Sequence, residues 1–532
     1  MSTKISNKHN LPSLPSETIV HIFKHIQHEP TLFSCLFVNR AWCRKIVPIL
    51  WARPKPAVYK ERASKSLIET YVSCFDNEEK AILFSEEDMS QMDHLKSPLF
   101  EYAVFLKELN YPLLRLAVRS CYRNLGNKEF SKRIKPTKPE VEVNPNRQIT
   151  IMKALCNLFM RMSRLESLVL DSYDDIPNVP LFTRGNCFNN LFNLKIYWTN
   201  YAINMSNFIK RLPQICTGLR NLSIEFDLED GNFEAENIAA IIRSQQSLET
   251  FDLSGAHNQV APILDALESQ IDSLTSIKFS RINYHWQSLD VLGKCSKLKS
   301  LDIASYSCPV SREISDDSSN ATNGASFNLR SLKLLNQSPK LSAQLIRMGG
   351  SSLRSLSLNT VTPEIVNSIL RSGTRITHLS LDVSETPQLD FSQHLKIIGG
   401  LKILNYLRLS SSTPSDINNL LSAMITILPR SLRHLNIEHE FSLRHLGSFL
   451  SACRIPLEEL TLYPNMSIDT GFLTEIINYV KDLSSLKFLY LNLSWETGLI
   501  NKIFIREMTD DLQKYLFTID LDKLKGESIE QI

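Results

Sequence analysis

The sequence predicts an α/β fold in which a small all-α module is followed by a long array of strand–helix repeats. Three observations lead to this prediction. An apolar phrase, Leu-x-x-Leu-x-Leu, recurs thirteen times from Leu165 onward. Segments with helical spacing of apolar residues, such as IIRSQQSLETF, lie between the copies. The first fifty or so residues lack the phrase and carry an apolar stripe at helical spacing instead.

The thirteen copies of the phrase follow one another at intervals of 23 to 31 residues, with a mean of about 27. Ile or Phe sometimes replaces one of the three leucines. The copies begin at Leu165, Leu191, Leu219, Leu248, Leu274, Leu298, Leu329, Leu353, Ile376, Leu404, Leu432, Leu457 and Leu486. So regular a period in so long a segment is not expected by chance.

The phrase describes a short buried strand. Its last two apolar residues are two apart, so both point to the same side of a strand. One such strand cannot cover its own apolar face, whereas stacked copies form a parallel sheet with a continuous core. This pattern resembles the leucine-rich repeat family over residues 150–500, and it implies a curved solenoid with the sheet on the concave side and helices on the convex side. One departure is that the Asn or Cys that the family often places three residues after the phrase is present only at Asn465. Other groups must therefore satisfy the turns.

The array is expected to occupy residues 151–500. Residues 54–150 are predicted to form connecting helices and a loop, with a degenerate first repeat at LKELNY, residues 106–111. We find no full phrase in residues 501–532, and we expect this segment to cap the open end of the sheet.

The amino-terminal module is expected to contain three helices. Pro15 suits the first turn of the first helix, and Ser13 or Ser16 can cap it. The apolar stripe of this helix comprises Ile19, Ile22, Phe23 and Ile26. Pro30 should end this first helix, and Thr31 should begin a second one. Asn39 is a suitable cap for a third helix, which Pro48 should bend or end.

This module resembles the F-box over residues 11–53. The resemblance rests on an ordered set of positions rather than on any one of them. The set comprises Leu14-Pro15-x-Glu17, Ile19, Ile22-Phe23, Cys35-x-x-Val38-x-x-x-Trp42 and Pro48-x-Leu50-Trp51. A leucine-rich array downstream often accompanies this module in the family.

The resemblance implies the substrate-recognition subunit of a Skp–cullin–F-box ubiquitin ligase. Its partners would be a Skp-family adaptor, through it a cullin ligase, and an unknown protein substrate. Trp42 and Trp51 are expected to be packing residues within the module or against the adaptor. The adaptor contacts that the resemblance implies are Leu14, Pro15, Ile19, Ile22, Phe23, Leu32, Cys35 and Val38.

Composition excludes several other classes of function. The formal net charge is +3 among 532 residues, so no bulk attraction to nucleic acid or to a membrane surface is expected. No apolar run is long enough to span a bilayer, and the polar first ten residues argue against a secretory signal. The ten cysteines are scattered without a CxxC pair, which favours a reduced cytoplasmic or nuclear setting.

No catalytic, cofactor or metal site is predicted. The segment HIFKH places His21 and His25 four residues apart on a helix, but Ile22 lies where a zinc protease has Glu and no third ligand is evident. We therefore expect two solvated histidines. The glycine-rich loops that bind nucleotides and the GxSxG motif are both missing, so the chain is not expected to be an enzyme.

The outward residues of the last repeats differ from those of the earlier ones. Early strands present small or polar side chains, as at Ser276, Lys278 and Ser280. Late strands present aromatic and charged ones, which are common where binding energy is concentrated. We expect the substrate surface to include Tyr406, Arg408, His434, Glu438, Glu459, Tyr463, Phe488 and Tyr490, although these rings could instead cover the terminal repeat. A scaffold or inhibitor without any link to ubiquitin remains the alternative function.

Overall fold

The protein is described from a computed structural model. The part of the chain that it describes comprises residues 14–26, 28–54, 61–83, 98–123, 145–172, 176, 186–198, 203–226, 235–255, 260–282, 290–305, 328–384, 391–411, 414–438, 443–452, 455–462, 478–479, 481, 485–491 and 518–521. The chain forms two compact units, Met1–Leu248 and Glu249–Ile532, and each is described by itself.

The first unit begins with three short helices whose starts are set by local chemistry. They are α1 (Ser16–His25), α2 (Glu29–Cys35) and α3 (Arg40–Ala52). The side chain of Asn39 accepts a hydrogen bond from the Trp42 N–H at 2.9 Å, so the predicted cap of α3 is present.

Some predicted details of these helices were wrong. Pro15, and neither serine that we expected, occupies the N-cap of α1, and no side chain caps this end. Pro30 lies in the first turn of α2, where its missing N–H is not needed, so α2 begins before Thr31. Pro48 lies inside α3, which continues to Ala52.

The rest of the first unit builds the start of the repeat array. The helices are α4 (Glu61–Ser73), α5 (Asn77–Leu83), η1 (Tyr102–Phe105), α7 (Tyr111–Arg123), α9 (Pro145–Met162), η3 (Asn186–Phe188), α10 (Ile203–Ile215) and α11 (Ala235–Ser244). The strands are β1 (Glu108–Asn110), β2 (Ser167–Asp171), β3 (Asn193–Trp198) and β4 (Asn221–Phe226). They pair in parallel in chain order. β1 lies in the segment where a degenerate first repeat was expected.

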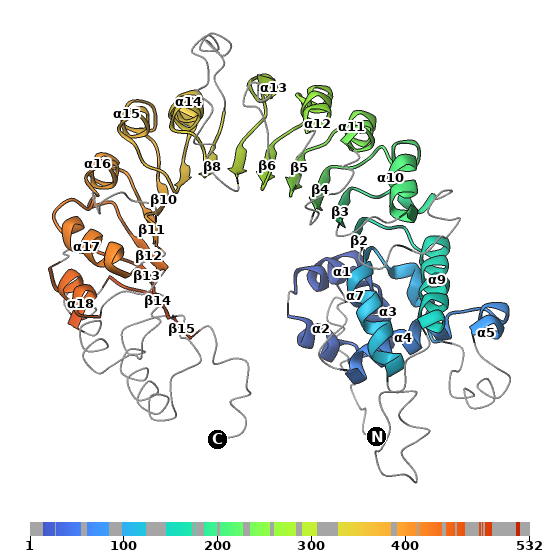
Figure 1. The fold of residues 1–532 in the computed structure, drawn as a ribbon. Helices are drawn as coiled ribbons and strands as arrows, with labels where there is room; N and C mark the ends of the chain where they lie inside the picture. Colours follow the sequence, from blue (N-terminus) through green and yellow to red (C-terminus); the bar gives the residue numbers. More distant parts are fainter. Residues whose placement is uncertain are drawn as a thin grey trace, which may run out of the picture. The chain divides into compact units, whose positions relative to one another are not determined.

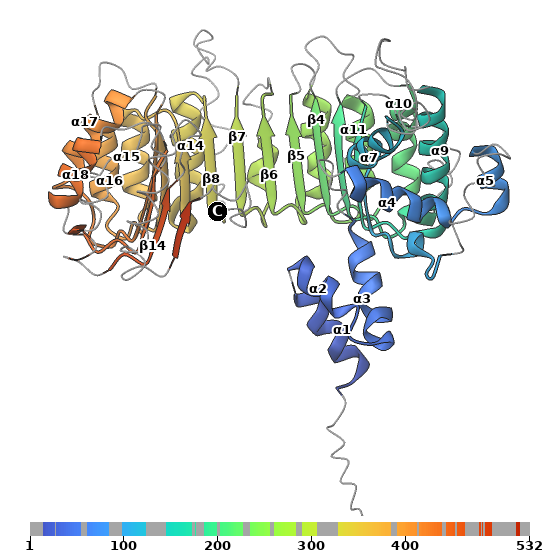
Figure 2. The same ribbon diagram turned by 90° about the horizontal axis from the view of Figure 1, so that it is seen from below.

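The helical module joins this array through the end of α3. Trp51 packs against Tyr102 and Tyr71, with ring centroids 4.3 and 5.3 Å apart. The carbonyl of Ala52 accepts a hydrogen bond from the Lys107 N–H at 2.9 Å, just before β1. Figure 2 shows α1, α2 and α3 apart from the sheet of this unit, with α3 leading toward α4 and α7. Trp51 is thus a packing residue, but it packs against the connecting region and not within the module or on an adaptor as predicted.

The second unit is a parallel sheet with helices on one face, and its strands pair in chain order. The helices lie on the same side of the strands (Figure 1). The strands are β5 (Thr250–Ser254), β6 (Ser276–Ser280), β7 (Ser300–Ala304), β8 (Ser331–Leu335), β9 (Ser355–Leu358), β10 (His378–Asp382), β11 (Tyr406–Ser410), β12 (His434–Glu438), β13 (Glu459–Leu462), β14 (Phe488–Leu491) and β15 (Thr518–Leu521). The helices are α12 (Ala261–Ala266), η4 (Leu267–Gln270), α13 (Asp290–Lys294), α14 (Pro339–Gly349), η7 (Gly350–Ser352), α15 (Pro363–Ser372), α16 (Ser392–Gly400), α17 (Pro414–Met424) and α18 (Leu443–Ala452).

Every copy of the phrase forms a strand, which confirms the predicted fold class. In β6 the two apolar residues Ile277 and Phe279 are fully buried, whereas the outward side chain of Lys278 between them is exposed. The same alternation repeats along the sheet, as the period of two requires. The core therefore lies between the sheet and its helices, and the other face of the sheet is open.

One strand was missed by the sequence analysis. Residues 516–521, LFTIDL, fit the phrase with Ile at its second apolar position, contrary to our statement that the last segment lacks it. β15 lies there and pairs in parallel with β14. The array thus extends one strand beyond Leu486.

Glutamine and tyrosine side chains pair backbone groups at the entries of two strands. Gln245 is buried, accepts a hydrogen bond from the Leu219 N–H at 2.9 Å and donates to the carbonyl of Cys216 at 3.1 Å. The hydroxyl of Tyr479 donates to the carbonyl of Ile455 at 2.7 Å. Each side chain comes from the segment that follows the strand whose entry it contacts, so buried backbone groups there remain paired.

Candidate functional site

The helical module has a small filled core. Phe23, Leu32 and Ile46 are buried, and the rings of Phe23 and Trp42 pack edge to face with centroids 5.0 Å apart. The half-buried side chains packed around them are Ile19, Ile26, Cys35, Leu36, Trp42, Ile49 and Leu50. One face of each helix is thereby used within the module itself.

A second set of large apolar residues in the same module is exposed to solvent. The exposed fractions are 56% for Leu14, 46% for Ile22, 57% for Phe33, 76% for Phe37 and 57% for Val38. The rings of Phe33 and Phe37 contact each other edge to face at 5.4 Å. Burying each such side chain is worth roughly 1.5–3 kcal/mol, so this surface is suited to contact with another protein.

The predicted adaptor contacts thus fall into two groups. Leu14, Pro15, Ile22 and Val38 are exposed, and Ile19 and Cys35 are half-buried. Phe23 and Leu32 are only 3% and 4% exposed, so in this structure they can support a binding surface but hardly contribute area to one.

Sequence reasoning missed Phe33 and Phe37. They are four residues apart on and just after α2, a spacing at which two rings meet on one side of a helix. The spacing was available as a signal, but it does not reveal which side of α2 faces the core.

A connected group of polar and aromatic side chains covers the open face of β10–β12. In one row, His378, Tyr406 and His434 lie on adjacent strands in register. The first two rings stack with centroids 5.6 Å apart, and the next two lie 6.4 Å apart. Partial burial, and secondarily the nearby His434, lowers the pKa of His378. This imidazole therefore stays neutral to lower pH than a free histidine.

The next residues along the same strands are linked by an ion pair and by hydrogen bonds. The guanidinium of Arg408 forms an ion pair with Glu438. The Asn436 side-chain amide donates to the hydroxyl of Tyr406 at 3.3 Å and to the Oε1 of Glu438 at 3.1 Å. His434 Nδ1 lies 3.0 Å from Glu459 Oε2 on β13.

The structure therefore brings most of the predicted substrate residues together. Glu459 and Phe488 continue the row of His434, and Tyr490 continues the row of Arg408. Tyr463 lies outside the described residues. His378 and Asn436 belong to the same group but were not in the predicted set. His378 was missed because the outward residues of the phrase at Ile376 include no Phe, Tyr or Trp.

Earlier strands of the second unit present a different open face. In a row that runs from β5 to β8, Lys278 Nζ lies 3.4 Å from Asp252 Oδ2, and Lys333 Nζ lies 3.6 Å from Asp302 Oδ2. Burial raises the pKa of Asp302 despite the opposing effect of Lys333 and Lys278. The charges in this row compensate one another, which leaves little excess charge for a ligand.

The described residues contain no group of three or more His, Cys, Asp or Glu side chains able to hold a metal ion. His21 and His25 are exposed on α1, with their Nε2 atoms 3.1 Å apart. Burial raises the pKa of the Cys156 thiol to about 12, and those of Cys187, Cys216 and Cys295 to about 11. These four thiols are therefore protonated near neutral pH and are poor nucleophiles. Within the described residues, no helix has both the length and the apolar character needed to cross a membrane.

Comparison with known proteins gives a family for the helical module. Residues 11–56 match the F-box-like family. Among solved structures, the chain is similar to the crystal structure of an internalin from Listeria monocytogenes, with 15% identity over 67% of this chain and 81% of that chain at a TM-score of 0.27. A similarity at this TM-score does not extend to function. No curated protein matches the chain.

Proposed function

Because this chain carries an F-box-like domain at residues 11–56 followed by leucine-rich repeats, we propose that it is the substrate-recognition subunit of a Skp–cullin–F-box ubiquitin ligase. F-box domains generally bind Skp-type adaptors, and open parallel sheets of this kind present large surfaces to protein partners. We propose F-box boundaries near residues 11 and 53, a connecting region to about residue 150, repeats to about residue 500 and a terminal segment beyond.

One observation carries this proposal furthest. The F-box-like module fills its own core with Phe23, Leu32 and Ile46, yet still exposes Ile22, Phe33 and other large apolar side chains. A module of about forty residues gains little stability from exposing such groups. The exposed set is the surface we assign to the adaptor: Leu14, Pro15, Ile22, Phe33, Phe37 and Val38, with Ile19 and Cys35 at its margin.

The chain would act through proximity rather than through chemistry of its own. Docking of the module on an adaptor would tether whatever the repeats bind near the ubiquitin-transferring components. A tether converts a bimolecular encounter into an intramolecular one with an effective concentration in the millimolar range for short connections. We assign substrate binding to the open face of β10–β14, because its rings and paired charges differ from the compensated face of β5–β8. Such a complex works in the cytosol or nucleus.

The test is co-purification of the full chain with a Skp-family adaptor. We expect a stoichiometric complex that is lost on combined substitution Ile22→Asp and Phe33→Asp, with circular dichroism unchanged. The alternative function, a repeat scaffold or inhibitor, predicts no complex with the adaptor at any concentration tested. Absence of a complex with the wild-type chain would therefore favour the scaffold.

A further inference from the structure

In the second unit, the part of the sheet edge at which strands β7–β12 begin is rich in basic residues. In a parallel sheet all strand starts lie at the same edge. The segments that lead into β7–β12 contain eight Lys or Arg residues and no Asp or Glu. These segments are residues 295–299, 328–330, 350–354, 372–377, 400–405 and 425–433. We call their basic residues the basic edge: Lys297, Lys299, Arg330, Arg354, Arg375, Lys402, Arg430 and Arg433.

Three members of the basic edge are direct neighbours across adjacent strands. The Arg330 N–H donates to the carbonyl of Lys299 at 2.7 Å, and the Arg354 N–H donates to the carbonyl of Arg330 at 2.9 Å. Neighbouring strands are about 4.8 Å apart, which is less than the Debye length of about 8 Å in physiological salt. Like charges placed side by side in this way repel, so the arrangement costs the free protein stability.

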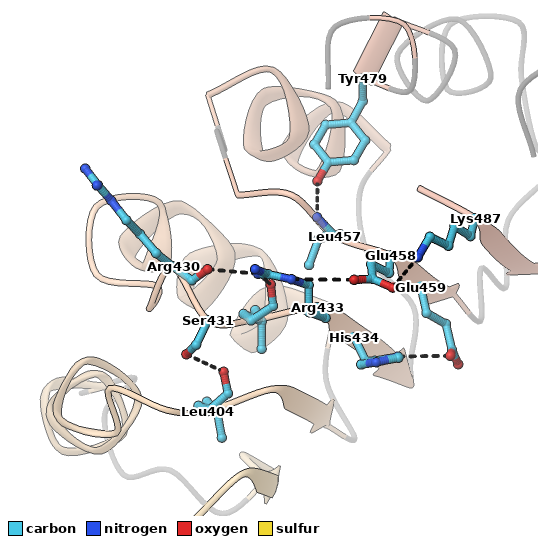
Figure 3. Close-up of polar contacts among 11 residues, drawn as sticks. Leu404, Arg430, Ser431, Arg433, His434, Leu457, Glu458, Glu459, Tyr479 and Lys487 are labelled. Atoms are coloured by element: carbon cyan, nitrogen blue, oxygen red, sulfur yellow. Dashed lines mark hydrogen bonds and ion pairs between the residues drawn. The ribbon is translucent and has the colours of Figure 1, made fainter. Parts of the chain in front are cut away.

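Within the described part of the chain, most of these cations have no partner. Among the described residues, six members have exposed side chains that form no ion pair or side-chain hydrogen bond with another described residue. They are Lys297, Lys299, Arg330, Arg375, Lys402 and Arg430. Figure 3 shows the guanidinium of Arg430 directed away from the neighbouring network of Arg433, Glu458 and Lys487.

Several other cations of the same unit are paired, and so is one member of the basic edge, Arg433. Glu458 lies between Arg433 and Lys487, at 3.6 and 2.8 Å, and these hydrogen bonds and charges lower the pKa of its carboxyl group. On the open face, Lys278 and Lys333 each have an aspartate partner. Among the described residues, the six unpaired members of the basic edge therefore differ from these paired cations.

Helix ends explain only part of the basic edge. Basic side chains near helix carboxyl termini can bond the last carbonyls. Arg354 does so with the carbonyls of Ser351 and Ser352 in η7, whereas Arg433 bonds the carbonyl of Arg430 in the turn before β12. None of the six uncompensated side chains makes such a contact with a described residue.

We propose that the basic edge binds an acidic segment of a partner protein, and, resting on the proposed function, that this partner is the substrate. An acidic segment would supply the missing charge and relieve the repulsion along Lys299, Arg330 and Arg354. The six segments contain no Phe, Tyr or Trp, so they offer no rings on which the bases of a single-stranded nucleic acid could stack. A protein segment therefore fits better than a nucleic acid.

The experiment measures binding of a fluorescein-labelled decaglutamate peptide to the full chain by anisotropy. A second peptide, with phosphoserine at alternate positions, distinguishes carboxylate from phosphate as the source of charge, and binding of either one supports the proposal. The test variant is Lys299→Glu with Arg330→Glu. The matched control is Lys340→Glu with Lys396→Glu, which makes the same change in net charge at exposed positions of α14 and α16.

We expect the test variant to weaken peptide binding at least about tenfold and the control to stay within about twofold. The test variant replaces two cations on adjacent strands with two carboxylates, so one pair of like charges takes the place of another, and it should melt at about the same temperature as the wild type. Equal weakening in both variants, absence of peptide binding, or tighter binding of an oligodeoxythymidine of equal charge would overturn the proposal.

Adaptor binding is measured on the same preparations. A chain that binds the adaptor but neither peptide contradicts the basic-edge proposal alone. A chain that binds a peptide but no adaptor contradicts the ligase function alone.

Discussion

Arg115 on α7 and Asp171 at the end of β2 form a two-point ion pair inside the first unit. Nη1 lies 3.2 Å from Oδ1 and Nη2 lies 2.9 Å from Oδ2. The side chains are only 19% and 11% exposed, and the paired geometry gives both charges strong hydrogen bonds. This contact fastens the first helix of the array to its second strand.

Removing one partner should destabilise the first unit. Arg115→Ala would remove both of these hydrogen bonds and the opposite charge from a largely buried carboxylate, which costs about 3 kcal/mol. Urea unfolding followed by tryptophan fluorescence measures the change. The matched control is Arg53→Ala, because Arg53 and Glu108 are more exposed, at 67% and 39%, and such pairs contribute about 1 kcal/mol or less. Equal effects of the two substitutions would contradict this account.

Substitutions at the neighbouring residues Ile22 and Phe23 of α1 should have different effects, the first on adaptor binding and the second on folding. Ile22→Asp changes an exposed side chain, so the module should stay folded while adaptor binding is lost. Phe23→Ala removes a core ring, which costs about 3–5 kcal/mol and should unfold the module. Circular dichroism and adaptor pull-down on both variants separate the two effects. A folded Ile22→Asp variant that still binds the adaptor would refute the assigned surface.

The open face of β10–β14 should be required for substrate but not for the adaptor. Combined alanine substitution at Tyr406, Arg408 and Tyr490 removes two rings and one ion pair from a surface that does not touch the core. We expect a defined set of ubiquitinated proteins to be lost in quantitative proteomics, with adaptor binding unchanged. The control is Ser331→Ala with Ser355→Ala on β8 and β9. Recovery of the same set from the test variant would place the substrate surface elsewhere.

Buried thiols should resist alkylation in the folded protein. Cys156, Cys187, Cys216 and Cys295 are buried, and burial holds the pKa of each thiol at about 11 or 12. Iodoacetamide at pH 8 followed by peptide mass spectrometry should modify them only after denaturation, because the thiolate is the reactive form. Cys35 and Cys43 are half-buried and provide internal references. Rapid labelling of Cys156 under native conditions would contradict its placement.

Stability should fall in alkaline solution through the same groups. Burial raises the pKa of Cys156 from 9.0 to about 12, and it raises the pKa of Tyr71 as well. Between pH 9 and about pH 12 the thiol is protonated in the folded state but increasingly ionised in the unfolded state. The free energy of unfolding is therefore unaffected by this group below about pH 9 and falls as the pH rises above it. One thiol contributes about 1.4 kcal/mol for each pH unit in this window. Melting curves between pH 8 and 11 should show a shallower decline for Cys156→Ala than for the wild type.

Most of the repeat array could be predicted because its signal is local. A strand of the phrase places its apolar residues two apart, and the intervals between copies repeat, so thirteen strands could be located before their partners were known. β15 shows how this method fails. LFTIDL carries the same signal, but it was overlooked within a polar segment that was expected to be a cap.

The binding surface of the helical module could be predicted only in part. Ile19, Ile22, Phe23 and Ile26 form one stripe in the sequence, yet Ile22 is exposed and Phe23 is buried. Helical spacing shows which residues share a face, but the position of Trp42 and Ile46 on α3 decides how much of that face is covered. The same reason hides the exposed pair Phe33 and Phe37.

The sequence by itself therefore determined the element types, their order and the residues that point away from the core, because these follow from periods of two and about 3.6 residues. Only the tertiary structure decided which charges meet. Arg408 and Glu438 are thirty residues apart and form an ion pair. Lys299 and Arg330 are thirty-one residues apart, and their neighbouring positions bring two positive charges to adjacent strands. The register between strands brings such residues together, and that register depends on the lengths of the helices and loops between them.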